Sequence, residues 1–185
     1  LEMGNKVVTM IREMAKPVVT ATRGDIRAAG LGFYLTGDVR LAGGTASFTA
    51  PDLAPGLMPD WGLTFTLPRL LGPSRTLEFL WSGRTLSAVE AWQAGLVDRV
   101  IVDAVWDDEL DDLMARLASL PQPMARLTKL AAQQGDQFDM TSMLSYEFEA
   151  QQQCWESRET SEGLTARQEG RRPAFQAPLS DEAEE

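Results

Sequence analysis

Two carboxylates stand out as residues that could do chemistry in this sequence. Asp60 follows Met58 and Pro59 and precedes Trp61, so an acidic side chain lies between apolar neighbours. Burial among apolar groups makes a carboxylate a stronger proton acceptor. Asp52 lies eight residues earlier, directly after a proline. These side chains are therefore candidates for acid–base catalysis.

A run of small residues, Ala28 to Gly32, is the second candidate feature. It follows the apolar segment Pro17–Ala21, which predicts a buried strand, and leads into a helical pattern at Phe33–Thr36. Small side chains let a ligand approach the backbone, and the start of a helix offers free N–H groups. The alternative is that these residues only allow a helix to pack tightly on a sheet.

Composition excludes several classes of site. The 185 residues contain no histidine and one cysteine, Cys154, so a Ser-His-Asp triad, a zinc site and an internal disulfide are all excluded within this sequence. The net charge of −10 and a pI near 4.5 argue against a nucleic-acid partner. Without a long apolar run, no membrane association is expected, and a cytoplasmic protein is the default.

Local patterns predict the elements around these residues. Ser87 and Glu90 have the spacing of a capping box, which predicts a helix that ends at Gly95. Pro68 should interrupt or kink a helix over 63–71. Other predicted strands cover 38–42, 46–49 and 97–102. Other predicted helices cover 5–14, 74–81, 106–119, 124–133 and 141–158, with a short last one, 162–168, capped by Thr160 or Ser161. The predicted organisation is a strand-rich core over 1–102, a helical region over 103–177 and a disordered acidic tail over 178–185.

Several segments in register resemble the crotonase (enoyl-CoA hydratase/isomerase) superfamily. They are Lys16–Val19, Arg23–Gly24, Ala28–Gly32, Asp38–Ala42, Gly56–Asp60, Leu67–Gly72, Ser82–Ala91 and Ala94–Asp98. The resemblance implies an α/β fold: a crotonase-like ββα spiral core with a helical C-terminal trimerisation region. It also implies that the N-terminal third of the family's core, which carries one of two oxyanion-hole N–H groups, is not in this sequence.

The resemblance also assigns roles in the site. It places the second oxyanion donor at Ala29, flanked by Ala28 and Gly30, and puts Trp61 near the substrate. The two glutamates of hydratases correspond here to Gly32 and Asp52, so two-carboxylate hydration is doubtful. The context of Asp60 is similar to a branch of the family with one working aspartate, which includes double-bond isomerases and an aryl-CoA dehalogenase. The alternative for Asp60 is to cap the helix that follows it.

The resemblance therefore implies an acyl-CoA thioester isomerase with Asp60 as the base. Other reactions on an acyl thioester (hydratase, hydrolase, decarboxylase) and a non-catalytic scaffold that binds the thioester are the alternatives. The expected partners are an acyl-CoA or acyl-carrier substrate and further copies of the chain, as a homotrimer or hexamer, with no metal and no other cofactor. Arg171 and Arg172 resemble a basic stretch that approaches the CoA phosphates, although a solvated pair is an equal alternative.

Overall fold

The computed structural model describes residues 2–175, and the chain divides into two compact units. The first unit reaches to Leu113 and the second starts at Met114, so the boundary falls within one helix, α6. The predicted tail over 178–185 lies outside the described residues.

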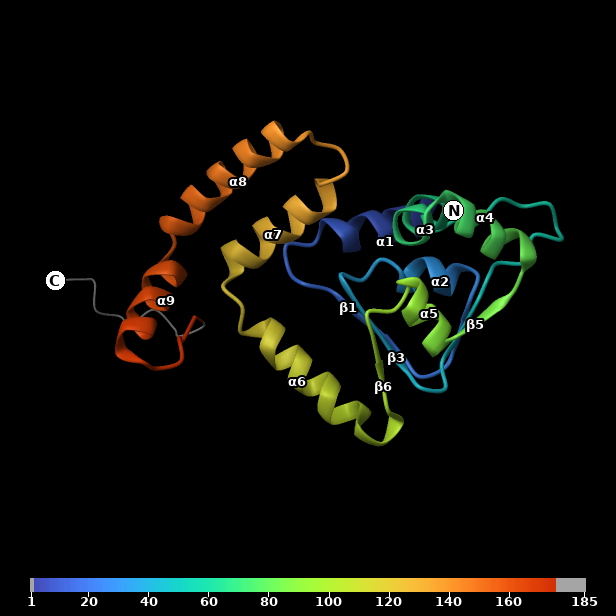
Figure 1. The fold of residues 1–185 in the computed structure, drawn as a ribbon, viewed down its shortest axis with the longest axis horizontal. Coiled ribbons are helices and arrows are strands. Elements are labelled where there is room, and N and C mark those ends of the chain that lie inside the picture. The colour runs from blue at the N-terminus through green and yellow to red at the C-terminus, as the bar shows by residue number, and fades with distance from the viewer. Residues whose placement is uncertain (1, 176–185) are drawn as a thin grey trace. The chain divides into compact units, whose positions relative to one another are not determined.

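The first unit contains all the strands of the described chain (Figure 1). Its elements are α1 Glu2–Glu13, β1 Val19–Thr22, β2 Asp25–Arg27, α2 Ala29–Tyr34, β3 Val39–Gly43, β4 Ser47–Thr49, α3 Leu63–Leu71, α4 Pro73–Ser82, β5 Thr85–Ser87, α5 Ala88–Ala94, β6 Arg99–Ile101, a 3-10 turn Asp103–Val105 and α6 Trp106–Ala118.

The strands form two three-stranded sheets that the chain enters alternately. β1, β3 and β6 form an all-parallel sheet in the order β1-β3-β6, while β2-β4-β5 form a second sheet in which β5 is antiparallel. Each passage from the first sheet to the second, β1 to β2 and β3 to β4, is followed by a helix. This repeated ββα unit is the predicted spiral core, and the α/β fold class is confirmed.

The core of the first unit lies where α2, α3, α4 and α5 meet the second sheet. Tyr34 of α2 is buried against Phe48 of β4, and its hydroxyl donates a 3.0 Å hydrogen bond to the Leu41 carbonyl. Burial raises the pKa of Tyr34 above its ordinary value. The other buried side chains of this cluster include Leu31, Leu35, Leu63, Leu67, Phe79, Leu80, Leu86, Leu96 and Val97. The helix α2 that carries the small residues is thus anchored by its own apolar face.

Local sequence signals explain several boundaries. The capping box is present: the Glu90 N–H donates to Ser87 Oγ and the Ser87 N–H donates to Glu90 Oε2, which starts α5. Gly95 ends that helix with a φ of 85°. The prediction of a boundary or kink at Pro68 is wrong as to the boundary, because α3 continues past Pro68 to Leu71. Pro68 removes one N–H from a helix whose buried Leu63 and Leu67 keep it in place.

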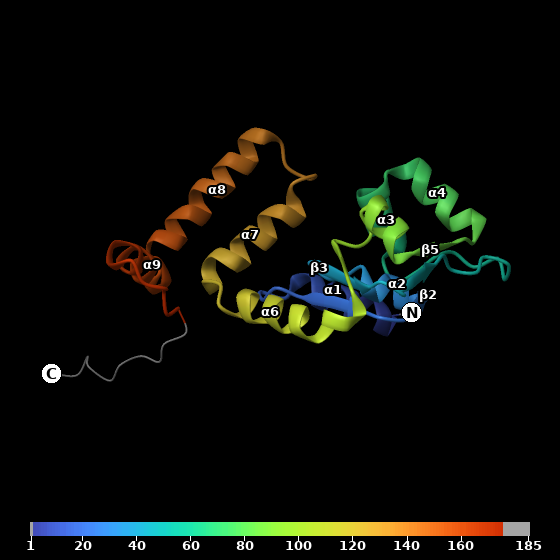
Figure 2. The ribbon, with the colours of Figure 1, turned by 60° about the horizontal axis from the view of Figure 1, so that its bottom comes forward.

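The second unit is helical from the end of α6 onward. It contains α7 Gln122–Gln134, α8 Met140–Trp155 and α9 Arg158–Glu169. α7 and α8 pack as an antiparallel hairpin (Figure 2). The predicted helix 141–158 ends earlier, because Ser157 Oγ accepts the Thr160 N–H and starts α9. The predicted cap at Thr160 or Ser161 is therefore wrong. None of the helices formed by residues 2–175 is long and apolar enough to cross a membrane.

Candidate active site

The predicted oxyanion segment begins with a residue in an unusual backbone conformation. Ala28, which precedes α2, has φ 49° and ψ −128°, a region that side chains other than glycine rarely adopt. The Ala28 carbonyl accepts hydrogen bonds from Leu31 N–H at 3.0 Å and Gly32 N–H at 3.5 Å. The N–H groups of Ala29 and Gly30 have no acceptor among residues 2–175. Two adjacent backbone donors are thus available to a ligand.

The turn with Asp60 leads directly into α3. The Asp60 carbonyl accepts the Leu63 N–H at 3.1 Å, Trp61 has a φ of 52°, and Gly62 has a φ of 76° and is the N-cap residue of α3. No side chain caps this helix, so the alternative role of Asp60 as a capping residue is not supported. The Asp60 carboxylate is half-buried and has no hydrogen bond or ion pair within the described part of the chain.

Trp61 joins this turn to α2. A Cβ placed on Gly32 would lie 2.4 Å from Trp61 Cβ and 2.7 Å from the Trp61 carbonyl oxygen. Gly32 lies one helical turn after Ala29, so the two residues share a face of α2. The structure therefore places Trp61 on the same face of α2 as Ala29, with Asp60 as its neighbour in the chain. It also explains why position 32 carries no side chain.

A groove lies on the neighbouring face of α2. It has a volume of about 550 Å³ and is lined by Gly30 and Phe33 of α2, by β1 including Val19 and Ala21, and by β2 including Ile26. Because each helical residue turns by about 100°, Ala29 lies between the face that contacts Trp61 and the face that lines this groove. Phe33 was not predicted as a site residue, although its apolar ring one turn after Gly30 is a sequence signal.

Asp52 interacts with its own turn and not with the residues described above. Its side chain is exposed, and its Oδ1 accepts the Ala54 N–H at 2.9 Å, a bond that stabilises the local turn. No hydrogen bond or ion pair joins Asp52 to Asp60 or to α2 among the described residues. Its carboxylate therefore has a structural task of its own.

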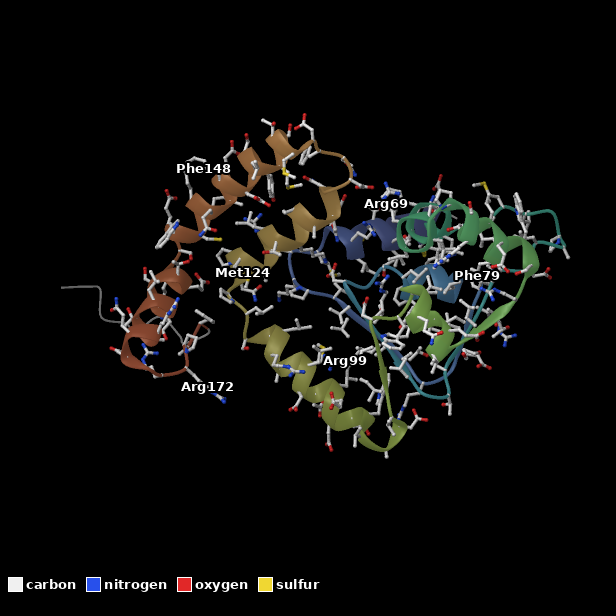
Figure 3. All side chains as sticks on the ribbon, viewed as in Figure 1. Arg69, Phe79, Arg99, Met124, Phe148 and Arg172 are labelled. Atoms are coloured by element: carbon white, nitrogen blue, oxygen red, sulfur yellow. The ribbon has the colours of Figure 1, made fainter. Side chains whose placement is uncertain are left out.

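The two C-terminal arginines lie in the second unit. Arg171 donates to both carboxylate oxygens of Glu162, at 2.6 and 3.0 Å, and to Glu169 at 2.6 Å. These bonds, together with the Ala174 N–H, lower the pKa of Glu162 to about 2. Arg172 is exposed beyond α9 (Figure 3). Most of the donor capacity of Arg171 is therefore used within the protein, which leaves Arg172 as the more available guanidinium of the pair.

Nothing in the described residues points to a metal centre. No three acidic or cysteine side chains among residues 2–175 come together in a way that could hold a metal ion. The candidate polar groups are the two backbone N–H groups at the start of α2 and the carboxylate of Asp60, which directly precedes Trp61. Such a set can remove a proton and stabilise the negative charge that results.

The sequence and the fold both have known relatives. Residues 2–178 match the family described as Enoyl-CoA hydratase/isomerase, and the chain belongs to this family, the crotonase superfamily. It is 34% identical to crotonyl-CoA hydratase of Syntrophomonas wolfei over 94% of this chain and 66% of that one. It also resembles the crystal structure of enoyl-CoA hydratase from Bacillus anthracis, with a TM-score of 0.89 and 30% identity over 94% of this chain and 67% of that one.

A third relative was solved with a ligand. The protein from Thermobifida fusca YX in complex with acetoacetyl-CoA is 34% identical with a TM-score of 0.74, over 78% of this chain and 57% of that one. The chain thus spans about two thirds or less of the length of these relatives. The predicted family and fold are confirmed.

Proposed function

We propose that this protein acts on an acyl-CoA thioester and shifts a carbon–carbon double bond through an enolate. The observation that carries the proposal is that Asp60, a carboxylate without a partner among the described residues, directly precedes Trp61, which packs on the face of α2 that also holds Ala29. The N–H groups of Ala29 and Gly30 donate no hydrogen bond to any described residue of the protein. The groove beside those donors has a mixed lining, with Phe33 and Ile26 among its apolar side chains and Asp25 and Arg27 among its polar ones.

In the proposed reaction Asp60 is first a base and then an acid. Its carboxylate removes the α-proton of a 3-enoyl thioester, and the electron pair moves into the carbonyl to form an enolate. The enolate oxygen accepts hydrogen bonds from Ala29, with Gly30 beside it. The protonated Asp60 then returns the proton to the γ-carbon, which re-forms the carbonyl and gives a 2-enoyl thioester. The carboxylate is regenerated, and no metal or further cofactor takes part.

The magnitudes expected for these roles are those of general base catalysis and oxyanion stabilisation. A positioned base contributes about 10²- to 10⁴-fold to a rate. A single oxyanion donor contributes about 10²- to 10³-fold. An aspartate without a second carboxylate suits a proton transfer within one substrate better than addition of water, which needs an activated nucleophile as well as an acid.

Hydration is the second candidate, because the relatives described above include proteins named crotonyl-CoA hydratase and enoyl-CoA hydratase. In this chain Gly32 has no side chain, and the Asp52 carboxylate accepts a bond from its own loop. A hydratase reaction would have to use Asp60 alone. Addition of water to a 2-enoyl-CoA is therefore assayed beside isomerisation.

The testing experiment compares Asp60→Asn with Asp52→Asn. We expect Asp60→Asn to lower the rate of 3-enoyl-CoA isomerisation by about 10²- to 10⁴-fold, because asparagine cannot accept the proton. Asp52→Asn should have a small effect, since its amide oxygen can still accept the Ala54 N–H. Binding of a saturated acyl-CoA, followed by thermal shift, should persist in both. Equal isomerase activity in the wild type and Asp60→Asn would rule out Asp60 as the base, and binding without any turnover would favour a scaffold.

We also propose that the second unit takes part in self-association. α8 exposes the large apolar side chains of Leu144, Phe148 and Trp155, at 56%, 67% and 59% of their surface. Exposed apolar side chains along one helix are typical of a surface that meets another subunit. A homotrimer or hexamer would cover them.

A further inference from the structure

Trp61 has a backbone conformation that is sterically unfavourable for a residue with a side chain. Its φ is 52°, and Gly62 after it has a φ of 76°, so two successive residues are left-handed. For a residue other than glycine this conformation costs about 1–3 kcal/mol and persists only where surrounding structure holds it. The residue directly before Trp61 is Asp60. The contacts that hold Trp61 therefore also bear on the proposed base.

Two helices hold Trp61, each through a glycine. On α2, the Cβ position of Gly32 is taken by the Cβ and carbonyl of Trp61. On α1, a Cβ on Gly4 would lie 2.9 Å from both Cε2 and Cζ2 of the indole. Each distance is shorter than a normal carbon contact, so a methyl group at either glycine would force the tryptophan to move. Gly4 is buried although its neighbours Met3 and Asn5 are exposed.

The contact at Gly4 is the first of a series along α1. Val8 Cγ1 would lie 3.4 Å from a Cβ on Gly62, and the Arg12 guanidinium lies 5.2 Å from the centre of the Phe65 ring. Gly4, Val8 and Arg12 are each four residues apart, so they form one face of α1. That face follows the chain from Trp61 to Phe65. α1 therefore acts as a support for the turn and for the start of α3.

The position of Asp60 depends on this support, because no side-chain interaction within the described residues fixes its carboxylate. Its only described hydrogen bond is the one from the Leu63 N–H to its carbonyl, which belongs to the same turn. We propose that Trp61 is a positioning residue: clamped between Gly4 of α1 and Gly32 of α2, it sets Asp60 against the Ala29 and Gly30 donors. This inference rests on the proposed function, since it concerns the geometry of the proposed base.

The central test is a double-mutant cycle between Gly4→Ala and Trp61→Gly. Glycine at position 61 adopts a positive φ without strain. This variant therefore removes the indole while the backbone can still form the turn. Gly4→Ala should lower kcat for 3-enoyl-CoA by about 10-fold and Trp61→Gly by about 10²-fold, with little change in KM, because a displacement of about 1 Å costs on that order. In the Trp61→Gly background, Gly4→Ala should have no further effect, since the atoms it meets are gone.

The matched control is Asn5→Ala, which also adds helix preference to α1, at an exposed position. It should keep the wild-type kcat. If Gly4→Ala behaves like Asn5→Ala, or lowers kcat equally in both backgrounds, the positioning role of Trp61 is overturned.

A second readout separates this inference from the proposed function. The ¹³C resonance of the Asp60 carboxylate, identified by its loss in Asp60→Asn, reports the surroundings of that group whether or not the protein turns over a substrate. We expect it to move in Gly4→Ala and in Trp61→Gly, and to stay in place in Asn5→Ala. A wild type without isomerase activity would refute the proposed function alone, whereas an Asp60 resonance unmoved by both variants would refute the positioning role alone.

Discussion

Ala28 and Trp61 are the two residues other than glycine with a positive φ between residues 2 and 175, and both lie at the candidate site. Strained backbone often marks functional sites, where surrounding contacts hold a geometry that local preference opposes. The run of small residues at Ala28–Gly32 predicted a place where a ligand could approach the backbone. The strain itself could not be predicted, because alanine and tryptophan both favour negative φ.

Ala28 gives a stability prediction. Ala28→Gly should raise the free energy of unfolding by about 1 kcal/mol, because glycine adopts φ 49° and ψ −128° without steric cost. Isomerase activity should be kept, since the donors are backbone N–H groups. Urea unfolding of the variant beside Gly44→Ala, a glycine with open space around its Cβ position and no positive φ, measures the effect. A less stable Ala28→Gly protein would contradict the strain at this residue.

The glycines at positions 4 and 32 show where sequence reasoning stopped. Each lies inside a helix, where glycine is less favourable than alanine by about 1 kcal/mol, and this is a signal that something approaches closely. The sequence does not say which residue approaches. Only the fold shows that the same tryptophan meets both glycines.

Elements with strong local signals were predicted well, and elements without them were missed. The capping box at Ser87 gave the start of α5 and Gly95 gave its end, because both signals are local. β2 and β5 have three residues each, and only their pairing with β4 identifies them as strands. The start of α9 was misplaced because Ser157, Thr160 and Ser161 can all cap a helix, and only the structure shows which one does.

The ion pair between Glu162 of α9 and Arg171 gives a prediction about pH. Because hydrogen bonds from Arg171 and the Ala174 N–H lower the pKa of Glu162 to about 2, its ionised form is favoured in the folded state. A lowered pKa stabilises the fold above the unfolded pKa of about 4.3, and this contribution is lost as the pH falls through the folded pKa. Glu162→Gln should therefore lower the Tm at pH 7 and have little effect near pH 2. The control is Glu147→Gln, an exposed position on α8. A Tm difference that is the same at both pH values would contradict the ion-pair role.

The molecule as a whole belongs to a confirmed family, but its candidate site has neither of the two glutamates that hydratases use. The resemblance predicted the ββα spiral because many weak motifs occur in one order, and spacing of this kind constrains a fold more than any single motif. The reaction could not be predicted with the same force, because position 32 is a glycine and Asp52 bonds to its own loop. The proposed chemistry therefore depends on Asp60 and on what positions it.

Self-association is the prediction for the whole molecule. Phe148→Glu should shift the protein toward smaller species in light scattering, because it places a charge on the exposed apolar side of α8. Gln153→Glu adds a charge on the opposite side of the same helix, where a carboxylate can still accept the hydrogen bond from Arg126, and should leave the mass unchanged. A wild type that is monomeric at all concentrations, or a Phe148→Glu protein of unchanged mass, would contradict the proposed role of α8.

The most direct test of the central proposal is deuterium incorporation into a 3-enoyl-CoA in D₂O, followed by NMR. If Asp60 removes the α-proton to form an enolate, the wild type should catalyse the entry of deuterium at the α- and γ-carbons. With Asp60→Asn, deuterium should enter only at the uncatalysed rate measured in buffer without protein. This exchange reports enolate formation even when the net reaction is small. Equal incorporation with Asp60→Asn, or neither incorporation nor isomerisation with a wild type that binds the thioester, would contradict an enolate mechanism based on Asp60.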